Sequence, residues 1–143
     1  MAPSAHPRIP EIRTVMFPRD INHMGSIFGG HILSLLDLAA AQFAHSFSAR
    51  KYVTKVMREV NFISPVYVGD RVSFYCTLRH VGTTSLTIRV DVEAFRGIRS
   101  SKIIKVTSAE VVMVAVDDNF HPVPVLDRPR KKKRGKKRNV ENA

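Results

Sequence analysis

The most informative part of this chain is the stretch NHMGSIFGGHILSLLD, which runs from Asn22 to Asp37. It begins with turn-forming residues, passes through Gly29 and Gly30, and enters a long apolar segment. Apolar residues recur there at intervals of three and four, which predicts a helix from about Gly29 or Gly30 to about Ser46. The expected core-facing positions are Ile32, Leu36, Ala39, Ala40, Phe43 and Phe47.

Asp37 is the only formal charge between Asp20 and Arg50. Its neighbours in the sequence are apolar, so no polar face of the helix is visible around it. Burying a carboxylate is expensive unless it is paired, hydrogen-bonded or protonated. We therefore expect Asp37 to be buried and functional, and a solvated aspartate on an outer face is the alternative.

Segments with strand character surround the helix. Residues 11–17 form a short one, and four longer ones follow at residues 52–63, 72–81, 85–95 and 103–116. The segment at residues 85–95 alternates apolar and polar residues, as in a half-buried antiparallel strand. The order predicts an α+β fold, in which one helix covers an antiparallel sheet and the four long strands form a meander. A second copy of the chain could pair with the edge of this sheet.

The length of 143 residues suits one domain with a real core. We divide it into a loose leader (1–10), one folded domain (11–125) and a basic, disordered tail (126–143). Residues 127–143 hold nine of the 23 basic residues and a net charge of +7, which leaves +4 for the rest. Cys76 is the only cysteine and no secretory signal is visible, so we expect a protein of the reducing cytoplasm.

Several kinds of site find no support in the sequence. The nucleophile elbow, the phosphate-binding loop and the dinucleotide-binding glycine motif are missing. The six histidines show no metal-binding spacing, Cys76 is interpreted as a buried, inert thiol, and no metal or other cofactor is expected. The helix around Asp37 carries too many polar groups for a membrane span.

The residues left for chemistry are Asn22, Gly29, Gly30 and Asp37. Glycines at a helix start let a ligand approach unpaired N–H groups, which would stabilise an oxyanion formed from a carbonyl. Asp37 could act as general base or as nucleophile, and Asn22 could orient water or the carbonyl. A tight turn with helix packing is the structural alternative for the two glycines.

Seven helical residues separate Gly30 from Asp37, which is roughly 10 Å at ~1.5 Å per residue. One carbonyl does not easily contact both in one chain. We therefore expect an obligate homodimer in which Asn22, Gly29 and Gly30 of one copy face Asp37 of the other.

These motifs resemble a known family. The run N-x-x-G-x-x-F-G-G-x-x-x-x-x-x-D, with VNFISPVYVGD at 60–70 and VGTTS at 81–85, is similar to acyl-CoA thioesterases of the hotdog fold, closest to the YciA-like and cytosolic acyl-CoA hydrolase branch. The resemblance covers about residues 11–125. It implies a long helix wrapped by a curved antiparallel sheet, dimers that often assemble as trimers of dimers, and hydrolysis of acyl-CoA to a free acid and CoA. CoA is then part of the substrate and product.

By position, the resemblance implies that Asp37 is the catalytic carboxylate and Asn22 its partner across the interface. Gly29 or Gly30 would be the oxyanion donor. Contacts with the substrate and CoA would come from the turn that follows the second long strand and from the helix start, at Phe28, Gly82, Thr83, Thr84 and Ser85. Arg58 and Arg79 are candidates for the CoA phosphates, with solvated strand arginines as the favoured alternative.

The tail KKKRGKKR lies outside this resemblance. A solubilising extension is its plain interpretation, and attraction to nucleic acid, anionic membrane or CoA are others. It contains no aromatic residue to stack on bases, which disfavours nucleic acid. One alternative to a thioesterase is a non-catalytic acyl-CoA-binding hotdog protein, a regulator that contacts nucleic acid through the tail. A third class is a nucleic-acid-binding protein driven by the tail alone.

Overall fold

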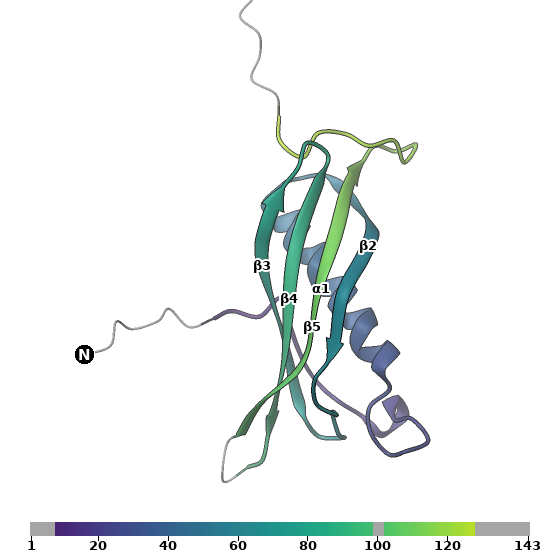
Figure 1. Ribbon diagram of the computed structural model, residues 1–143, viewed down its shortest axis with the longest axis vertical. Coiled ribbons are helices and arrows are strands. Elements are labelled where there is room, and N and C mark those ends of the chain that lie inside the picture. Colours follow the sequence, from purple (N-terminus) through teal and green to yellow (C-terminus); the bar gives the residue numbers. More distant parts are fainter. Residues whose placement is uncertain (1–7, 99–101, 128–143) are drawn as a thin grey trace, which may run out of the picture.

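The computed structural model describes residues 8–98 and 102–127, and most of the expected leader and tail lie outside these ranges. One long helix lies across one face of a curved sheet (Figure 1). The elements in chain order are β1 (Ile12–Val15), a 3-10 turn (Pro18–Asp20), α1 (Gly29–Phe47), β2 (Lys51–Phe62), β3 (Arg71–Val81), β4 (Ser85–Arg96) and β5 (Lys102–Val116). All the expected elements are present, with bounds within one or two residues at most ends.

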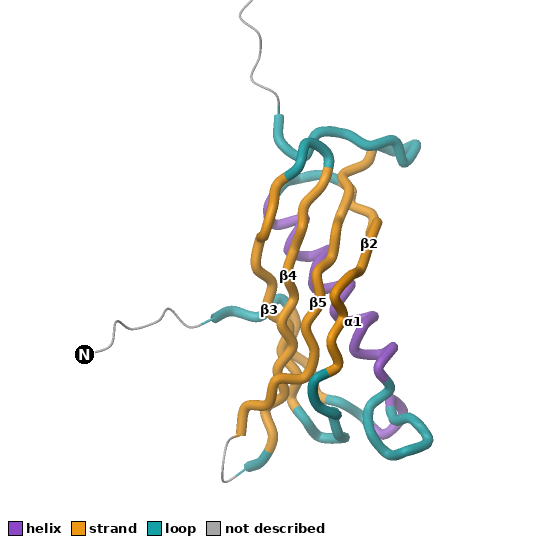
Figure 2. Tube along the Cα trace, in the orientation of Figure 1, coloured by secondary structure: helices purple, strands orange, loops and turns teal. Residues whose placement is uncertain are grey.

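The sheet is antiparallel, and its strands lie in the order β1-β3-β4-β5-β2. Figure 2 shows β3, β4, β5 and β2 side by side in this order. The predicted meander of four long strands is wrong in one respect. The strands β3, β4 and β5 are consecutive neighbours, but β2 pairs with β5 and not with β3. Neighbouring strands in the sequence are adjacent only as a tendency. Here the connection after β2 crosses the sheet and leaves β2 at an edge.

The core lies between α1 and the inner face of the sheet. The helix buries one stripe, and Leu36, Ala39, Ala40 and Ala44 are each 0% exposed. The inner sheet face contributes the buried side chains Phe74, Leu86, Ile88, Val90, Val111 and Met113. The predicted stripe is confirmed at Ile32, Leu36, Ala39 and Ala40, whereas Phe43 is half-buried and Phe47 is 37% exposed.

Apolar side chains also occur on the side of α1 that faces away from the sheet. Leu38 is 48% exposed there. A helix that is apolar almost all round normally has neighbours on every side, and the described part of this chain supplies them on the sheet side. The outer surface of α1 is therefore available to another copy.

The loop between β2 and β3 is held by an ion pair between a buried carboxylate, Asp70, and the partly exposed Arg96. Asp70 accepts hydrogen bonds from Arg96 Nε at 2.9 Å and Nη2 at 2.7 Å, and from the Tyr67 N–H at 2.9 Å. Arg96 also donates to the Pro65 carbonyl at 3.2 Å. Gly69 has a φ of +87°, which suits glycine in this turn. These contacts fix the loop against the start of α1, since the Ile27 N–H donates to the Val66 carbonyl at 2.7 Å.

Candidate functional site

Asn22 shapes the loop that leads into α1. Its Oδ1 accepts from the N–H groups of Met24 (2.9 Å) and Ser26 (3.3 Å), and its Nδ2 donates to Ser26 Oγ at 3.0 Å. Its backbone N–H also donates to the Ser26 carbonyl at 2.7 Å, and Gly25 has a φ of +88°. The predicted tight turn is confirmed. An amide nitrogen carries two hydrogens, so one hydrogen of Nδ2 is left for another acceptor.

The start of α1 offers unpaired backbone donors. Phe28 precedes the helix, and no side chain of the described residues caps its N-terminus. The N–H groups of His31 and Ile32 donate to the Phe28 carbonyl at 3.0 and 3.4 Å, whereas those of Gly29 and Gly30 have no acceptor in this described part of the chain. These two N–H groups and the helix dipole favour negative charge at this point.

Both glycines lie close to an aromatic ring at the helix start, and a side chain at either position would require that ring to shift. A Cβ on Gly29 would lie 3.2 Å from a ring carbon of Phe62, and one on Gly30 would lie 2.4 Å from a ring carbon of Phe28. The structural interpretation of the glycine pair is therefore supported, and it leaves their N–H groups accessible. Phe28 itself is 59% exposed beside them.

Asp37 is not buried in this chain, contrary to the expectation. It is half-buried, and its Oδ1 accepts a hydrogen bond from Thr54 Oγ1 on β2 at 2.6 Å. The reason is that β2 runs along one side of α1 at the edge of the sheet and brings a hydroxyl to the carboxylate. The carboxylate is therefore hydrogen-bonded and open to solvent.

Asp37 lies beside a free sheet edge. One side of β2 pairs with β5, and the other side has no strand partner among the described residues. Within the chain, Asp37 and the helix start at Gly30 remain separated along α1 by about 10 Å, at ~1.5 Å per residue. A second copy that paired along β2 would come close to Asp37.

The turn from Gly82 to Ser85 joins β3 to β4. The Gly82 N–H donates to the Ser85 carbonyl at 2.7 Å, and a Cβ on Gly82 would lie 2.6 Å from Ser85 Oγ. The carbonyls of Thr83 and Thr84 accept from the N–H groups of Val125 (2.9 Å) and Ala115 (2.8 Å). Figure 1 shows this turn at the opposite end of the molecule from the start of α1. The fold therefore does not bring the two predicted substrate-binding segments together within one chain.

Thr84 and Ser85 line a hollow of about 360 Å³ on the outer face of the sheet. Its floor is apolar, with Val112 and Val114, and Lys55 lies at its side. Of the two arginines considered for phosphates, Arg58 pairs with Glu110 at 2.8 Å, and Arg79 is exposed on β3.

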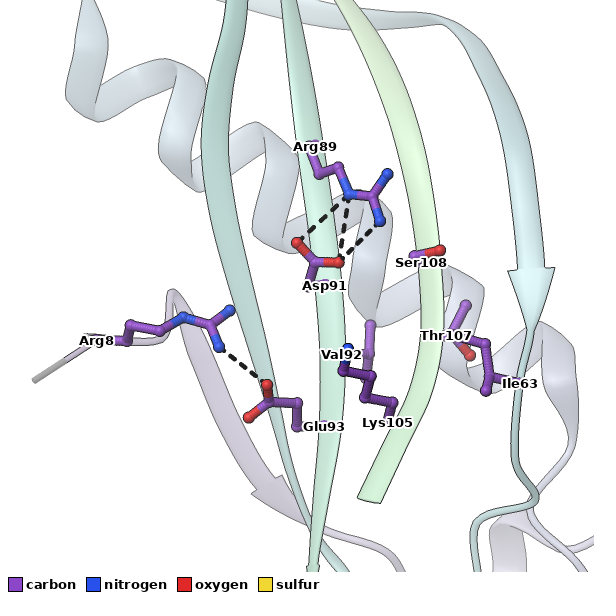
Figure 3. A pocket seen from close by; sticks show the side chains of 9 residues that line it. All are labelled: Arg8, Ile63, Arg89, Asp91, Val92, Glu93, Lys105, Thr107 and Ser108. Atoms are coloured by element: carbon purple, nitrogen blue, oxygen red, sulfur yellow. Dashed lines mark hydrogen bonds and ion pairs between the residues drawn. The ribbon is translucent and has the colours of Figure 1, made fainter. Parts of the chain in front are cut away.

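A second hollow on the outer face, of about 300 Å³, is lined by charged side chains (Figure 3). Arg8 pairs with Glu93 at 2.9 Å, and Arg89 pairs with Asp91 at 3.2 Å. Lys105 also lines the hollow, so its lining carries three cations and two carboxylates. It lies on the sheet face that α1 does not cover.

Two hollows of different character flank the start of α1. One, of about 320 Å³, is lined by Gly29 and mainly by apolar side chains of α1, β2, β5 and the loops beside them, with Ser64 and Thr107 as its polar members. The other, of about 410 Å³, is open and polar, and it is lined by Arg19, Asp20, Ile21, Phe28, Gly30 and His31. There His31 Nε2 lies 3.6 Å from Asp20 Oδ2. Gly29 and Gly30 thus face an apolar and a polar hollow respectively.

Cys76, a metal site and a membrane-spanning helix were the remaining features considered from the sequence. Burial raises the pKa of the Cys76 thiol to about 12, and the charges of Glu11 and Asp91 contribute. That agrees with an inert thiol. Across residues 8–98 and 102–127, no group of three His, Cys, Asp or Glu side chains could hold a metal ion. In the same ranges, no helix is both long and apolar enough to cross a bilayer.

Sequence reasoning missed Thr54 and the apolar hollow beside Gly29. Thr54 lies 17 residues from Asp37, and only the path of β2 along α1 brings the two together. The hollow draws on α1, β2, β5 and the β2–β3 loop, so no local pattern reveals it. A hydroxyl within a strand rich in β-branched residues was the only available signal for Thr54.

The chain is similar to known proteins over most of its length. Residues 24–100 match the family model of the thioesterase superfamily. An acyl-CoA thioester hydrolase, YciA, of Salmonella typhimurium is 35% identical over 117 residues, which is 80% of this chain and 87% of that protein.

Solved structures show the same fold. A hexameric hotdog fold thioesterase of Campylobacter jejuni has a TM-score of 0.77 and 40% identity over 80% of this chain and 88% of that one. A hexameric broad-specificity acyl-coenzyme A thioesterase, solved as an aspartate-to-alanine mutant, has a TM-score of 0.79 and 32% identity over 89% and 91% of the two chains.

Proposed function

The chain belongs to the thioesterase superfamily, and from this premise we propose that it hydrolyses acyl-CoA thioesters to a free carboxylic acid and CoA. The observation that carries the proposal is the pairing of two features on one helix. Unpaired N–H groups stand at its start, and a hydrogen-bonded, accessible carboxylate, Asp37, stands two turns further on. Acyl transfer requires two groups, a hydrogen-bond donor that stabilises the oxyanion and a general base or nucleophile.

We assign the N–H of Gly29 or Gly30 to the thioester oxygen, which becomes negative as the carbonyl carbon is attacked. Preorganised donors aimed at such an oxygen commonly contribute 10²–10³ in rate. The free hydrogen of Asn22 Nδ2 can orient the carbonyl or the attacking water. When the C–S bond breaks, the sulfur of CoA leaves and takes up a proton.

Asp37 has two possible roles that differ in a measurable way. As general base, it accepts a proton from water while the water oxygen bonds to the carbonyl carbon. As nucleophile, its own oxygen attacks and forms an anhydride that water then hydrolyses. Single-turnover hydrolysis in ¹⁸O-labelled water tests for the nucleophilic route, because ¹⁸O enters Asp37 only when water attacks the Asp37 carbonyl carbon of the anhydride.

We further propose that the site is completed by a second copy. In a homodimer formed along the free edge of β2, the helix start of one copy would face Asp37 of the other, which removes the separation of about 10 Å within one chain. The exposed apolar side of α1 supports such an assembly. Three such dimers would form a hexamer, the assembly of the similar solved structures.

We place CoA along the turn Gly82, Thr83, Thr84 and Ser85, and Lys55 beside Ser85 is a better candidate for a phosphate than Arg58. Phe28 would contact the substrate near the thioester. Residues 11–125 carry this activity in our proposal, without a metal or other cofactor. A cytoplasmic setting fits the lone Cys76.

The decisive experiment measures release of the CoA thiol from acetyl-, hexanoyl-, decanoyl- and palmitoyl-CoA, with Asp37→Ala alongside. We expect turnover by the wild type and a loss of activity of at least 10²–10⁴-fold in the variant, because a general base contributes a factor in that range. Circular dichroism and light scattering check that the variant keeps its fold and assembly. Binding of acyl-CoA without turnover by the wild type would overturn the proposal in favour of a non-catalytic binding protein.

A further inference from the structure

The last described segment of the chain is fastened to the turn between β3 and β4 (Figure 1). Val125 is 1% exposed, and its N–H donates to the Thr83 carbonyl at 2.9 Å. Arg50, which follows α1, also holds this segment. Its Nε donates to the Pro124 carbonyl at 3.0 Å, and its Nη2 pairs with Asp127 at 2.6 Å. Asp127 follows Val125 by two residues, a path of at most about 7 Å. The described chain therefore ends beside the turn along which we place CoA.

The described residues around this turn supply little free positive charge. Lys55 is the one charged side chain among those that line the hollow beside the turn. Arg50 already pairs with Asp127, and Lys51 at the start of β2 pairs with Asp118. The CoA part of an acyl-CoA is a polyanion, because it carries a diphosphate and a further phosphate. Lys55 alone does not balance this charge.

The residues that follow Asp127 carry many cations. Residues 128–143 contain nine basic residues against Glu141. Arg130 is three residues beyond Asp127, which is at most about 11 Å of chain. That length is close to the Debye length of ~10 Å at 0.1 M ionic strength, so charges so near the turn act on an anion bound there. The nine basic residues are Arg128, Arg130, Lys131, Lys132, Lys133, Arg134, Lys136, Lys137 and Arg138.

We propose that the basic side chains from Arg128 to Arg138 bind the phosphates of CoA at the turn between β3 and β4, and that they thereby raise the affinity for acyl-CoA. This inference rests on the proposed thioesterase activity and on the placement of CoA along this turn. The phosphates keep their charge throughout the reaction, so the attraction is equal in the ground state and the transition state. It therefore lowers KM and leaves kcat unchanged.

The decisive variant is the full-length chain in which all nine basic residues are replaced by glutamine. This variant keeps the length of the chain and the folded domain. At about 0.01 M ionic strength, where the Debye length is ~30 Å, we expect its KM for hexanoyl-CoA to be roughly tenfold above that of the wild type, with the same kcat. At about 1 M, where the Debye length is ~3 Å, the two KM values should agree.

A substrate without phosphates is the first control. Hexanoyl-pantetheine keeps the thioester and lacks the nucleotide, so the wild type and the glutamine variant should have equal KM values for it at both ionic strengths.

A second variant tests position against net charge. It keeps the glutamine residues and carries a copy of residues 128–143 ahead of Met1, which restores the net charge at the other end of the chain. Arg8 pairs with Glu93, which lies about 26 Å along β4 from Ser85 at ~3.3 Å per residue. The KM of this variant for hexanoyl-CoA should lie closer to that of the glutamine variant than to that of the wild type.

The outcomes separate the two proposals. If the wild type hydrolyses no acyl-CoA, the proposed function is wrong. If it does, but the glutamine variant keeps the wild-type KM at low ionic strength, the thioesterase activity stands and this inference is overturned. Loss of retention on DNA in that variant would then assign the basic residues to nucleic acid. An equal rise in KM for hexanoyl-pantetheine, or a wild-type KM in the second variant, would also overturn the inference, because the phosphates or the position of the charge would then be irrelevant.

Discussion

Thr54 Oγ1 donates a 2.6 Å hydrogen bond to Oδ1 of Asp37, and this contact joins the edge strand β2 to the middle of α1. It holds the carboxylate at the sheet edge where we place the second copy. Because a hydroxyl donor favours one orientation of the carboxylate, Thr54 is a positioning residue for Asp37.

Replacing Thr54 with Val removes this donor at nearly constant volume. We expect kcat to fall roughly tenfold with little change in KM, since a hydrogen bond to a charged group contributes about 1.5 kcal/mol. Thr54→Ser, which keeps the hydroxyl, should retain most of the activity. Equal kcat values for the wild type and the valine variant would remove Thr54 from the mechanism.

A shared site predicts complementation between two inactive variants. Asp37→Ala removes the carboxylate, and Gly30→Val obstructs the N–H groups at the helix start. In a mixed dimer one of the two sites is intact, so co-refolding equal amounts should restore about a quarter of the wild-type activity. Each variant refolded alone is the control. If the mixture stays as inactive as its components, both groups act within one chain or the dimer proposal is wrong.

The ion pair of Asp70 and Arg96 predicts acid sensitivity. Burial alone would raise the pKa of Asp70, but hydrogen bonds from Arg96 and the Tyr67 N–H, with the Arg96 charge, bring it below its ordinary value of 3.8. A lowered pKa in the folded state stabilises the protein above the unfolded value, and this contribution is lost as the pH falls through the folded pKa.

Arg96→Ala should therefore lower the free energy of unfolding at pH 7 by about 2 kcal/mol, less than for a fully buried pair because the Arg96 side chain is 36% exposed. The deficit should shrink as the pH falls below 3.8, where Asp70 of the unfolded state takes up a proton, and should be lost below the lowered pKa of Asp70 in the folded wild type. Urea titrations of both proteins at pH 7 and pH 3 provide the measurement. A deficit independent of pH would show that Arg96 acts through packing on Tyr67, whose ring centroid lies 4.8 Å from its guanidinium carbon.

Thr107 predicts a stabilising substitution. Its side-chain oxygen is the one buried polar side-chain atom without a hydrogen-bond partner in the described ranges, and the residue is 1% exposed. Thr107→Val keeps the shape and removes the unpaired hydroxyl, so the free energy of unfolding should rise by about 1 kcal/mol. Thr107→Ser, which keeps the hydroxyl and loses a methyl group, should be destabilising. A less stable valine variant would mean that the hydroxyl has a partner in the assembled protein.

Cys76 should be unreactive in the folded protein. Because burial raises its pKa to about 12, hardly any thiolate is present at pH 8. We expect negligible labelling by a disulfide reagent under native conditions and rapid labelling in guanidinium chloride. Fast labelling of the native protein would show that β3 opens readily. The result also sets the background of any assay that detects the CoA thiol.

The local pattern of the chain determined its elements and the face of α1 that enters the core. Periods of three to four residues and of two residues follow from backbone geometry, so Leu36, Ala39 and the alternation along β4 could be interpreted without the fold. The turns at Gly25 and Gly69 could also be predicted, because few residues other than glycine adopt their positive φ.

Only the tertiary structure decided that β2 pairs with β5, that Asp37 meets Thr54, and that an apolar hollow adjoins Gly29. Each depends on contacts between residues far apart in the chain, and hydrophobic periodicity does not specify which strand lies beside which. Asp37 appeared buried from its apolar neighbours in the sequence. It is half-exposed because an α-helix turns about 100° per residue, so adjacent side chains point in different directions, and this one points to the open edge of the sheet.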